Sequence, residues 1–179
     1  MRTPVFELHI RPMFRATDRE HMQHLFGEDF DLWNYDAVVE FADRILDSLE
    51  QSMPPDDTGG PWPVEWVLLF QRWRLAGFKR LELGKGTYEV LRTEDVADLV
   101  ATFTLPAPGW SGWLQLESVS DTSRTYILYL EAPDDPEGGL AEEVTDSEQF
   151  DVPGLEKLFI HDKDGVKQLA IPQTPDGAG

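Results

Sequence analysis

The side chains best placed for chemistry are two histidines and an aspartate near the amino terminus. Asp18, His21 and His24 recur at every third position of a stretch with helical spacing. Residues three apart lie on similar faces of a helix, so His21 and His24 could share a metal ion with a carboxylate. Asp18 and His24, however, diverge by about 120° around an axis with 3.6 residues per turn, which weakens a site built from all three. Two hypotheses follow: a metal site, or surface histidines on an acidic helix.

The rest of the chain offers no familiar catalytic pattern. Its serines stand outside any nucleophile-elbow context, and Gly84-Lys-Gly86 is too short for a phosphate-binding loop. His161 beside Asp162 suggests acid–base chemistry, but an aspartate that begins a turn has a backbone reason to be there. The sequence therefore predicts no catalytic residue and no cofactor.

Composition excludes several classes of ligand. The 179 residues carry a formal net charge of −19, which repels nucleic-acid phosphates and anionic lipid. There is no cysteine, so disulfides, thiolate zinc sites, iron–sulfur clusters, cysteine nucleophiles and covalently attached haem are all excluded. The acidity fits either solubility alone or electrostatic steering toward a basic protein partner.

The amino terminus gives no sign of export. Its sequence, Met-Arg-Thr-Pro-Val-Phe, lacks the apolar segment of a signal peptide. No run approaches the roughly 18 apolar residues that a membrane-spanning helix needs. We therefore expect a cytoplasmic protein that binds neither membrane nor nucleic acid.

The first part of the chain shows helical periodicity. Thr17-Asp-Arg-Glu20 has the form of a capping box and predicts a short helix that ends near Gly27. A second helix is predicted to stop at Pro54-Pro55, since proline cannot continue the hydrogen-bond ladder. A third begins at Pro63 and is capped by Gly77 in the left-handed conformation. The apolar positions of the second and third helices are Val38, Phe41, Ala42, Ile45, Leu46, Leu49, Met53, Trp66, Leu69, Phe70 and Trp73.

From Lys79 onward the pattern becomes that of short strands separated by turn-rich segments. Asp164-Gly165 is a hairpin signal between two of them. The acidic segment Pro133–Asp151 is predicted to be a long loop, and the tail after Pro172 to be frayed. The strand-like runs are Tyr88–Arg92, Leu99–Leu105, Trp113–Val119, Tyr126–Glu131, Leu155–His161 and Lys167–Ile171.

Together these patterns predict an α+β protein with two subdomains. The first is a three-helix bundle over residues 1–79. The second is an antiparallel β-sandwich over residues 80–172, followed by a flexible tail over 173–179.

The helical part resembles a small c-type cytochrome domain from which the haem attachment has been lost. The elements that carry the likeness follow one another in that family's order: Ile10-Arg-Pro12, Met53-Pro-Pro55 and the Trp-bearing helix over Trp62–Gly77. Where the family has Cys-x-x-Cys-His, this sequence has Asp18, His21 and Met22, so both thiols and the axial imidazole are missing. The resemblance implies a helical frame kept without haem, and it covers residues 9–77.

The strand part resembles the accessory sandwich domains attached to tyrosinase- and haemocyanin-type copper proteins. This likeness rests on two strand sequences alone, Gly112-Trp-Leu-Gln-Leu-Glu117 and Ser123-Arg-Thr-Tyr-Ile-Leu-Tyr-Leu-Glu131. It implies a role alongside another protein.

Four residues are candidates for contact with a protein partner. Trp110 follows a Pro-rich turn and Trp113 stands three residues later, where aromatic side chains often anchor a partner or plug a domain interface. Arg72 and Arg74 belong to the only basic cluster, which could dock an acidic surface or simply favour a helix carboxyl end.

Three functions remain open from the sequence. The first is a non-catalytic accessory or chaperone-like protein that binds a partner enzyme, an oxidoreductase being the class that the resemblances indicate. The second is an acidic immunity or inhibitor protein that covers a basic toxin or nuclease. The third is a small metal-dependent enzyme that uses His21, His24 and a carboxylate.

Overall fold

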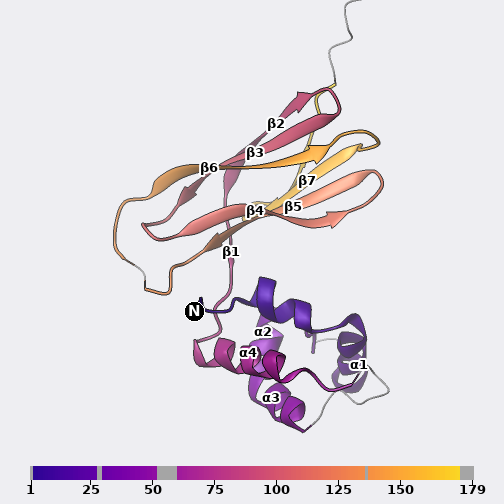
Figure 1. Cartoon of the computed structure of the whole chain (residues 1–179), viewed down its shortest axis with the longest axis vertical. Coiled ribbons are helices and arrows are strands. Elements are labelled where there is room, and N and C mark those ends of the chain that lie inside the picture. The colour runs from indigo at the N-terminus through magenta and orange to yellow at the C-terminus, as the bar shows by residue number, and fades with distance from the viewer. Residues whose placement is uncertain (1, 28–29, 52–59, 136, 174–179) are drawn as a thin grey trace, which may run out of the picture. The chain divides into compact units, whose positions relative to one another are not determined.

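The computed structural model of the chain describes residues 2–27, 30–51, 60–135 and 137–173. It is a mixed α+β structure that divides into two compact units, Met1–Arg80 and Leu81–Gly179 (Figure 1). We call them the helical unit and the strand unit. No helix among the described residues combines the length and apolar character needed to cross a membrane. Most of the tail predicted to be flexible, residues 174–179, lies outside the described residues.

The helical unit begins with two short turns and continues with four α-helices among its described residues. The turns are a π-helical element, η1 (Phe6–Ile10), and a 3-10 element, η2 (Arg11–Met13). The α-helices are α1 (Ala16–Phe26), α2 (Tyr35–Glu40), α3 (Ala42–Glu50) and α4 (Val64–Leu75). Gly77 follows α4 with a φ of 83°, which confirms the predicted left-handed cap.

The start of α1 differs from the predicted capping box. The carboxylate of Asp18 accepts hydrogen bonds from the Arg15 amide at 3.0 Å and from the Arg15 guanidinium at 2.9 Å. Arg15 is therefore the residue that precedes the helix, and Thr17 already lies inside it. The prediction for Thr17 was wrong because Asp18 reaches back three residues and satisfies both the amide and the charge of Arg15.

The predicted second helix is broken in two at Phe41, so the three expected helices become four. Asn34 caps α2 by accepting from the Ala37 amide at 3.0 Å, and Phe41 leaves helical geometry with a ψ of 11°. The Phe41 ring meets the edge of Phe30 with 4.5 Å between ring centroids. This contact is with a residue outside the helix, so the apolar spacing within the helix could not predict the break. The predicted stop at Pro54-Pro55 lies outside the described residues.

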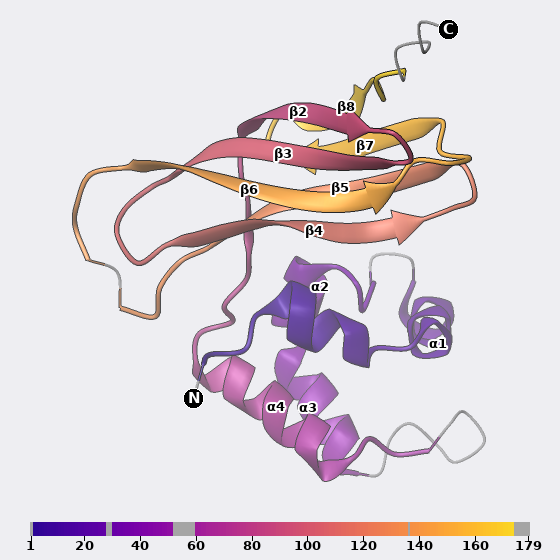
Figure 2. The same ribbon diagram turned by 45° about the horizontal axis from the view of Figure 1, so that its top comes forward.

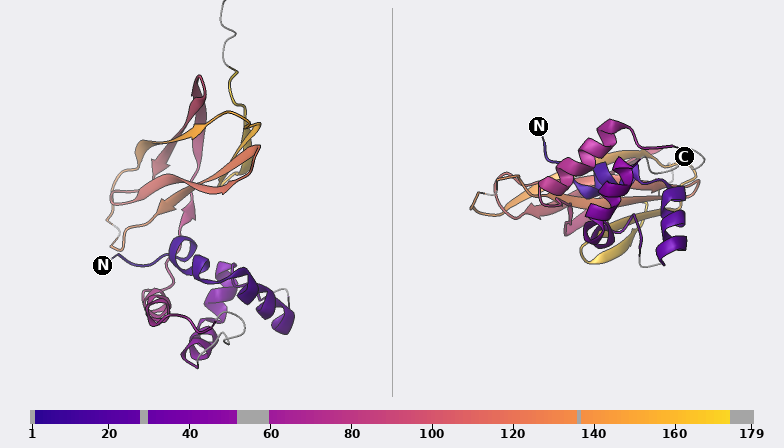
Figure 3. Two further views of the ribbon diagram at one scale, coloured as in Figure 1. Left: turned by 45° about the vertical axis from the view of Figure 1, so that its right-hand side comes forward. Right: turned by 90° about the horizontal axis from the view of Figure 1, so that it is seen from below.

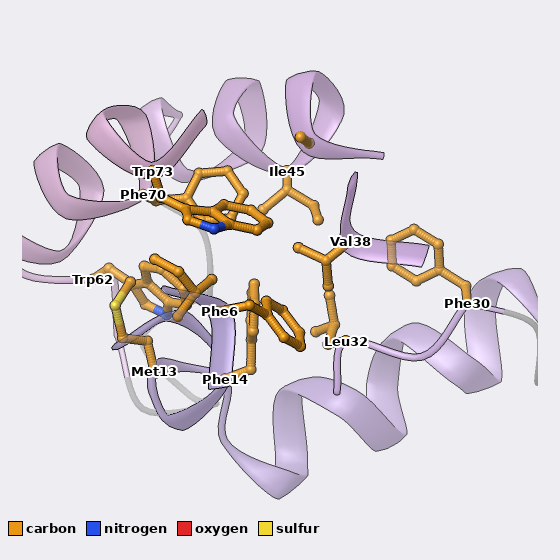
Figure 4. Packing of buried hydrophobic residues seen from close by; sticks show 12 residues of the cluster. Phe6, Met13, Phe14, Phe30, Leu32, Val38, Ile45, Trp62, Phe70 and Trp73 are labelled. Carbon is orange, nitrogen blue, oxygen red and sulfur yellow. The ribbon is translucent and has the colours of Figure 1, made fainter. Parts of the chain in front are cut away.

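Aromatic side chains dominate the core of the helical unit (Figure 4). Trp73 is fully buried, and its indole nitrogen donates to the Lys79 carbonyl at 2.8 Å. The same carbonyl accepts from the Phe6 amide at 3.0 Å, which ties the beginning of the unit to its end. The buried cluster consists of Phe6, Ile10, Met13, Phe14, Phe30, Leu32, Val38, Ala42, Ile45, Trp62, Phe70 and Trp73.

The strand unit contains two sheets (Figure 2). In the first, β5 (Ser123–Glu131) pairs on one edge with β4 (Ser111–Val119). On its other edge it pairs with β7 (Lys157–Asp162) and with the short β1 (Glu82–Leu83), and β8 (Gly165–Leu169) follows β7. The second sheet has the order β2-β3-β6, with bounds Gly86–Thr93, Val96–Leu105 and Glu142–Asp151.

Two predictions about the strands need correction. The pair of β5 and β7 is parallel, with Ser123 opposite Lys157, so the sheets are not purely antiparallel. The second half of the predicted Pro133–Asp151 loop is β6, which pairs along its whole length with β3. Its acidic residues hid an alternating pattern, in which Val144 and Phe150 pack toward the core while Thr145 and Gln149 are exposed. The six predicted runs and the hairpin at Asp164-Gly165 are confirmed.

One buried cluster draws side chains from both sheets. The carboxylate of Asp146 on β6 accepts from the Leu114 amide of β4 at 2.7 Å, which links strands of different sheets. Members of the cluster alternate along β3 and β5, so each strand turns one side toward it, although β5 is buried on both sides from Tyr126 to Glu131. They are Ala97, Leu99, Ala101, Phe103, Leu114, Tyr126, Leu128, Leu130, Phe150, Val152, Leu158 and Ile160.

Candidate binding site

A cavity of about 650 Å³ opens between α1 and α3 in the helical unit. We call it the α1–α3 cavity. Its volume lies in the range of about 300–1,000 Å³ that is typical of small-molecule sites. Apolar side chains make up most of its lining, and a few charged groups join them.

The wall formed by α1 is unusual because no residue of that helix is buried. The ribbon views place α1 beside the other helices rather than among them (Figure 3). Met22 is partly buried against the core, whereas Leu25 and Phe26, which line the cavity, are 56% and 53% exposed. Two large apolar side chains thus face a space that the described residues leave open.

The opposite side of the cavity is built from core residues. Phe14 and Trp62 contact each other with 5.2 Å between ring centroids, and Phe30 meets Phe41 edge to face. Ile45 joins them from α3, and it lies above Phe14 and near Val38 in the close view (Figure 4). Since these side chains are held by the core, the apolar surface is formed in advance and costs little entropy to present.

Trp62 has a second feature of interest. Its side chain is only 8% exposed, yet its indole nitrogen has no hydrogen-bond partner among the described residues. A buried donor without a partner costs about 1–3 kcal/mol of stability. The packing of the Trp62 ring must therefore stabilise the fold by more than the unpaired nitrogen costs.

The cavity lining includes one arginine and two carboxylates, which differ in whether they form ion pairs. The guanidinium carbon of Arg44 lies 5.8 Å from the Phe26 ring and 5.6 Å from the Phe41 ring. Within the part of the chain that the structure describes, no carboxylate forms an ion pair with Arg44. The carboxylate of Asp18 is neutralised by Arg15, and Glu40 adds an exposed carboxylate to the lining.

The predicted metal ligands are not assembled into a site. Asp18 and His21 both line the cavity, but both oxygens of Asp18 accept from Arg15, and His24 is an exposed residue outside the lining. Across residues 2–27, 30–51, 60–135 and 137–173, no three His, Cys, Asp or Glu side chains are grouped to hold a metal ion.

The four predicted partner-binding residues make contacts within their own units. Trp110 packs, partly buried, against the core of the strand unit, and Trp113 contacts Tyr129 with 6.4 Å between ring centroids. Arg72 donates to the Arg2 carbonyl at 3.2 Å, and Arg74 forms an ion pair with Asp43. Each of them therefore has an intramolecular role.

A buried carboxylate lies beside the histidine that the sequence had suggested for acid–base chemistry. Asp162 is 1% exposed, and it accepts from the Tyr88 hydroxyl at 2.8 Å, from the Asp164 amide at 2.9 Å and from the Lys167 ammonium. Burial raises the pKa of Asp162, but these three donors outweigh it and leave the pKa below its ordinary value. Burial is the largest cause that raises the pKa of Tyr88, and the hydrogen bond from its hydroxyl to Asp162 raises it further. The network joins β2 to the β7–β8 hairpin.

The sequence pointed to α1 for chemistry but missed the cavity. The available signal was Leu25-Phe26, an apolar pair just before Gly27 at the end of a helix whose other residues, apart from Ala16 and Met22, are polar or charged. An apolar pair of this kind can equally pack inward, so only the placement of α1 distinguishes the two cases.

Comparison with known proteins does not assign the chain to a family. No family model, no curated protein and no solved structure matches it.

Proposed function

We propose that this chain is a non-catalytic binding protein, accessory to a partner enzyme, and that its binding element is the α1–α3 cavity. The observation that carries the proposal is the open apolar wall, where Leu25 and Phe26 are each more than half exposed over a preformed aromatic surface. Exposed apolar surface that continues into a cavity is characteristic of ligand and partner sites.

The finer fold assignments belong to the same proposal. We infer that the two sheets form a β-sandwich, which the shared core cluster supports. We infer also that the helical unit keeps a cytochrome-like frame without haem, which the order of Ile10-Arg-Pro12 and the Trp-bearing helix supports. A frame that has lost its cofactor ligands retains an apolar interior that another guest can use.

Removing the apolar wall of α1 should weaken the binding of a neutral apolar guest. The Leu25→Ser/Phe26→Ser double variant is expected to weaken binding of N-phenyl-1-naphthylamine, followed by its fluorescence, at least tenfold, because about 25 cal/mol is lost per Å² of apolar contact. Both residues are exposed, so the fold should be kept. The matched control is Leu116→Ser/Val119→Ser on β4, two exposed residues of the strand unit. Equal loss in both double variants, or no saturable binding by the unaltered chain, would refute the proposal.

A second candidate function rests on the net charge of −19, which suits an inhibitor of a basic toxin or nuclease. Affinity capture from the native host at low and then moderate salt separates the two. We expect an oxidoreductase that stays bound as salt rises, because apolar contacts are not screened. A basic nuclease or toxin that is lost with salt would favour the inhibitor instead.

A further inference from the structure

We propose that the guest of the α1–α3 cavity is an amphipathic molecule with one acidic head group, of the aliphatic carboxylate class, and that Arg44 receives the head. This inference rests on the proposed function, since it names the guest of the same cavity. Its starting point is that Arg44 has no ion-pair partner among the described residues, although the chain has 34 acidic and 15 basic residues.

Arg44 differs from the arginines around it. Arg15 pairs with Asp18 at 2.9 Å, and Arg19 pairs with Asp31 at 2.6 Å. Arg74 likewise pairs with Asp43. Although acidic residues are abundant, no described carboxylate forms an ion pair with Arg44, which is the arginine that lines the cavity.

The surroundings of Arg44 prepare it for a carboxylate. Its guanidinium lies within 6 Å of two aromatic rings, Phe26 and Phe41, and such rings attract the cation while leaving its donors available. A guanidinium is planar and weakly hydrated, and it binds a carboxylate through two parallel N–H···O bonds. Arg44 therefore offers a head-group site at the edge of an apolar space.

The rest of the lining fits an aliphatic body. Leu25 and Phe26 on one side and Ile45 and Trp62 on the other leave about 650 Å³ of apolar space. The neighbouring carboxylate of Asp18 does not repel an acidic head, because Arg15 neutralises it. An anionic membrane is a poor alternative, because the charge of −19 opposes a surface that presents many negative charges, whereas a single carboxylate needs one cation.

Glu40 makes the inference testable in both directions. It is an exposed carboxylate of the cavity lining, and the structure shows no ion pair for it among the described residues. It should oppose an acidic head and favour a basic one. Removal of its charge is therefore the matched control for removal of the charge of Arg44.

Three probes with the same ten-carbon chain separate head from body: decanoate, decanol and decylammonium, each below its micelle concentration and measured by calorimetry on the full chain. We expect decanoate to bind about tenfold more tightly than decanol, and decylammonium most weakly. Arg44→Gln should weaken decanoate about tenfold and decanol less than twofold. Glu40→Gln should strengthen decanoate by about twofold to threefold.

The outcomes distinguish this inference from the proposed function. Equal affinity for the three probes, unchanged by Arg44→Gln, would overturn the acidic guest and leave the apolar cavity standing. Tightest binding of decylammonium, lost in Glu40→Gln, would overturn it in favour of a basic guest. If no probe binds the unaltered chain, both the guest and the proposed function fall.

Discussion

Replacing Asp162 by alanine is expected to lower the free energy of unfolding of the strand unit by about 3 kcal/mol. The carboxylate is 1% exposed and holds the Tyr88 hydroxyl, the Asp164 amide and the Lys167 ammonium together. Its removal leaves the partly buried Tyr88 hydroxyl and the Asp164 amide without this acceptor, and it leaves Lys167 with the longer ion pair to Asp164 at 3.8 Å. Urea unfolding followed by circular dichroism measures the change.

Asp164→Ala is the matched control, because Asp164 is exposed and its contacts with Lys85 and Lys167 are ion pairs in solvent. We expect it to cost less than about 1 kcal/mol. Similar losses in the two variants would contradict a structural role for the buried carboxylate.

The same network should make the strand unit sensitive to acid. The pKa of Asp162 is lowered in the folded state, so its stabilising contribution is complete above the unfolded value of about 3.9 and is lost as pH falls through the folded pKa. The difference in unfolding free energy between the unaltered chain and Asp162→Ala should therefore shrink below about pH 4. A difference that stays constant from pH 7 down to pH 2 would show that the charge of Asp162 does not matter.

Two buried tryptophans of the helical unit are expected to respond very differently to the same substitution. Trp73→Phe should cost about 2–3 kcal/mol, because it removes the 2.8 Å hydrogen bond to the Lys79 carbonyl and leaves space in a fully buried site. Trp62→Phe should change stability by less than about 1 kcal/mol. The lost ring volume is offset by removal of a buried indole nitrogen that has no partner among the described residues.

Thermal and urea unfolding of both variants provide the measurement, each variant being the other's control. Equal losses would mean that Trp62 has a polar partner in solution or that ring volume alone sets the cost.

Local pattern was sufficient for most elements of the fold. Apolar spacing placed α4 through Phe70 and Trp73, both fully buried. Short runs rich in β-branched and aromatic residues, separated by turn-rich segments, identified six of the eight strands in the described part of the chain. The turns at Gly77 and Gly165 were predictable because glycine adopts positive φ readily, and both residues do have positive φ.

The errors share a physical cause, since each depends on a contact between distant residues. The break at Phe41 accompanies its packing on Phe30, and β6 becomes a strand because β3 supplies its hydrogen bonds. The parallel pairing of β5 with β7 depends on where β6 returns the chain. No window of a few residues contains this information.

The candidate site was only partly predictable, for the same reason. Sequence spacing selected α1 and two of the cavity-lining residues, Asp18 and His21, but assigned them to metal. The features that carry the proposal are the exposure of Leu25 and Phe26 and the charge of Arg44, for which the described residues provide no ion-pair partner. Both follow from the position of α1 relative to α3, which local periodicity does not determine.

The most direct test of the central claim is to locate a bound apolar guest by nuclear Overhauser effects between unlabelled decanol and the isotope-labelled full chain. We expect contacts from the decanol chain to Leu25, Phe26 and Ile45 of the α1–α3 cavity. Contacts confined to the strand unit, for example to Leu116 and Val119, or none at saturating decanol, would contradict it.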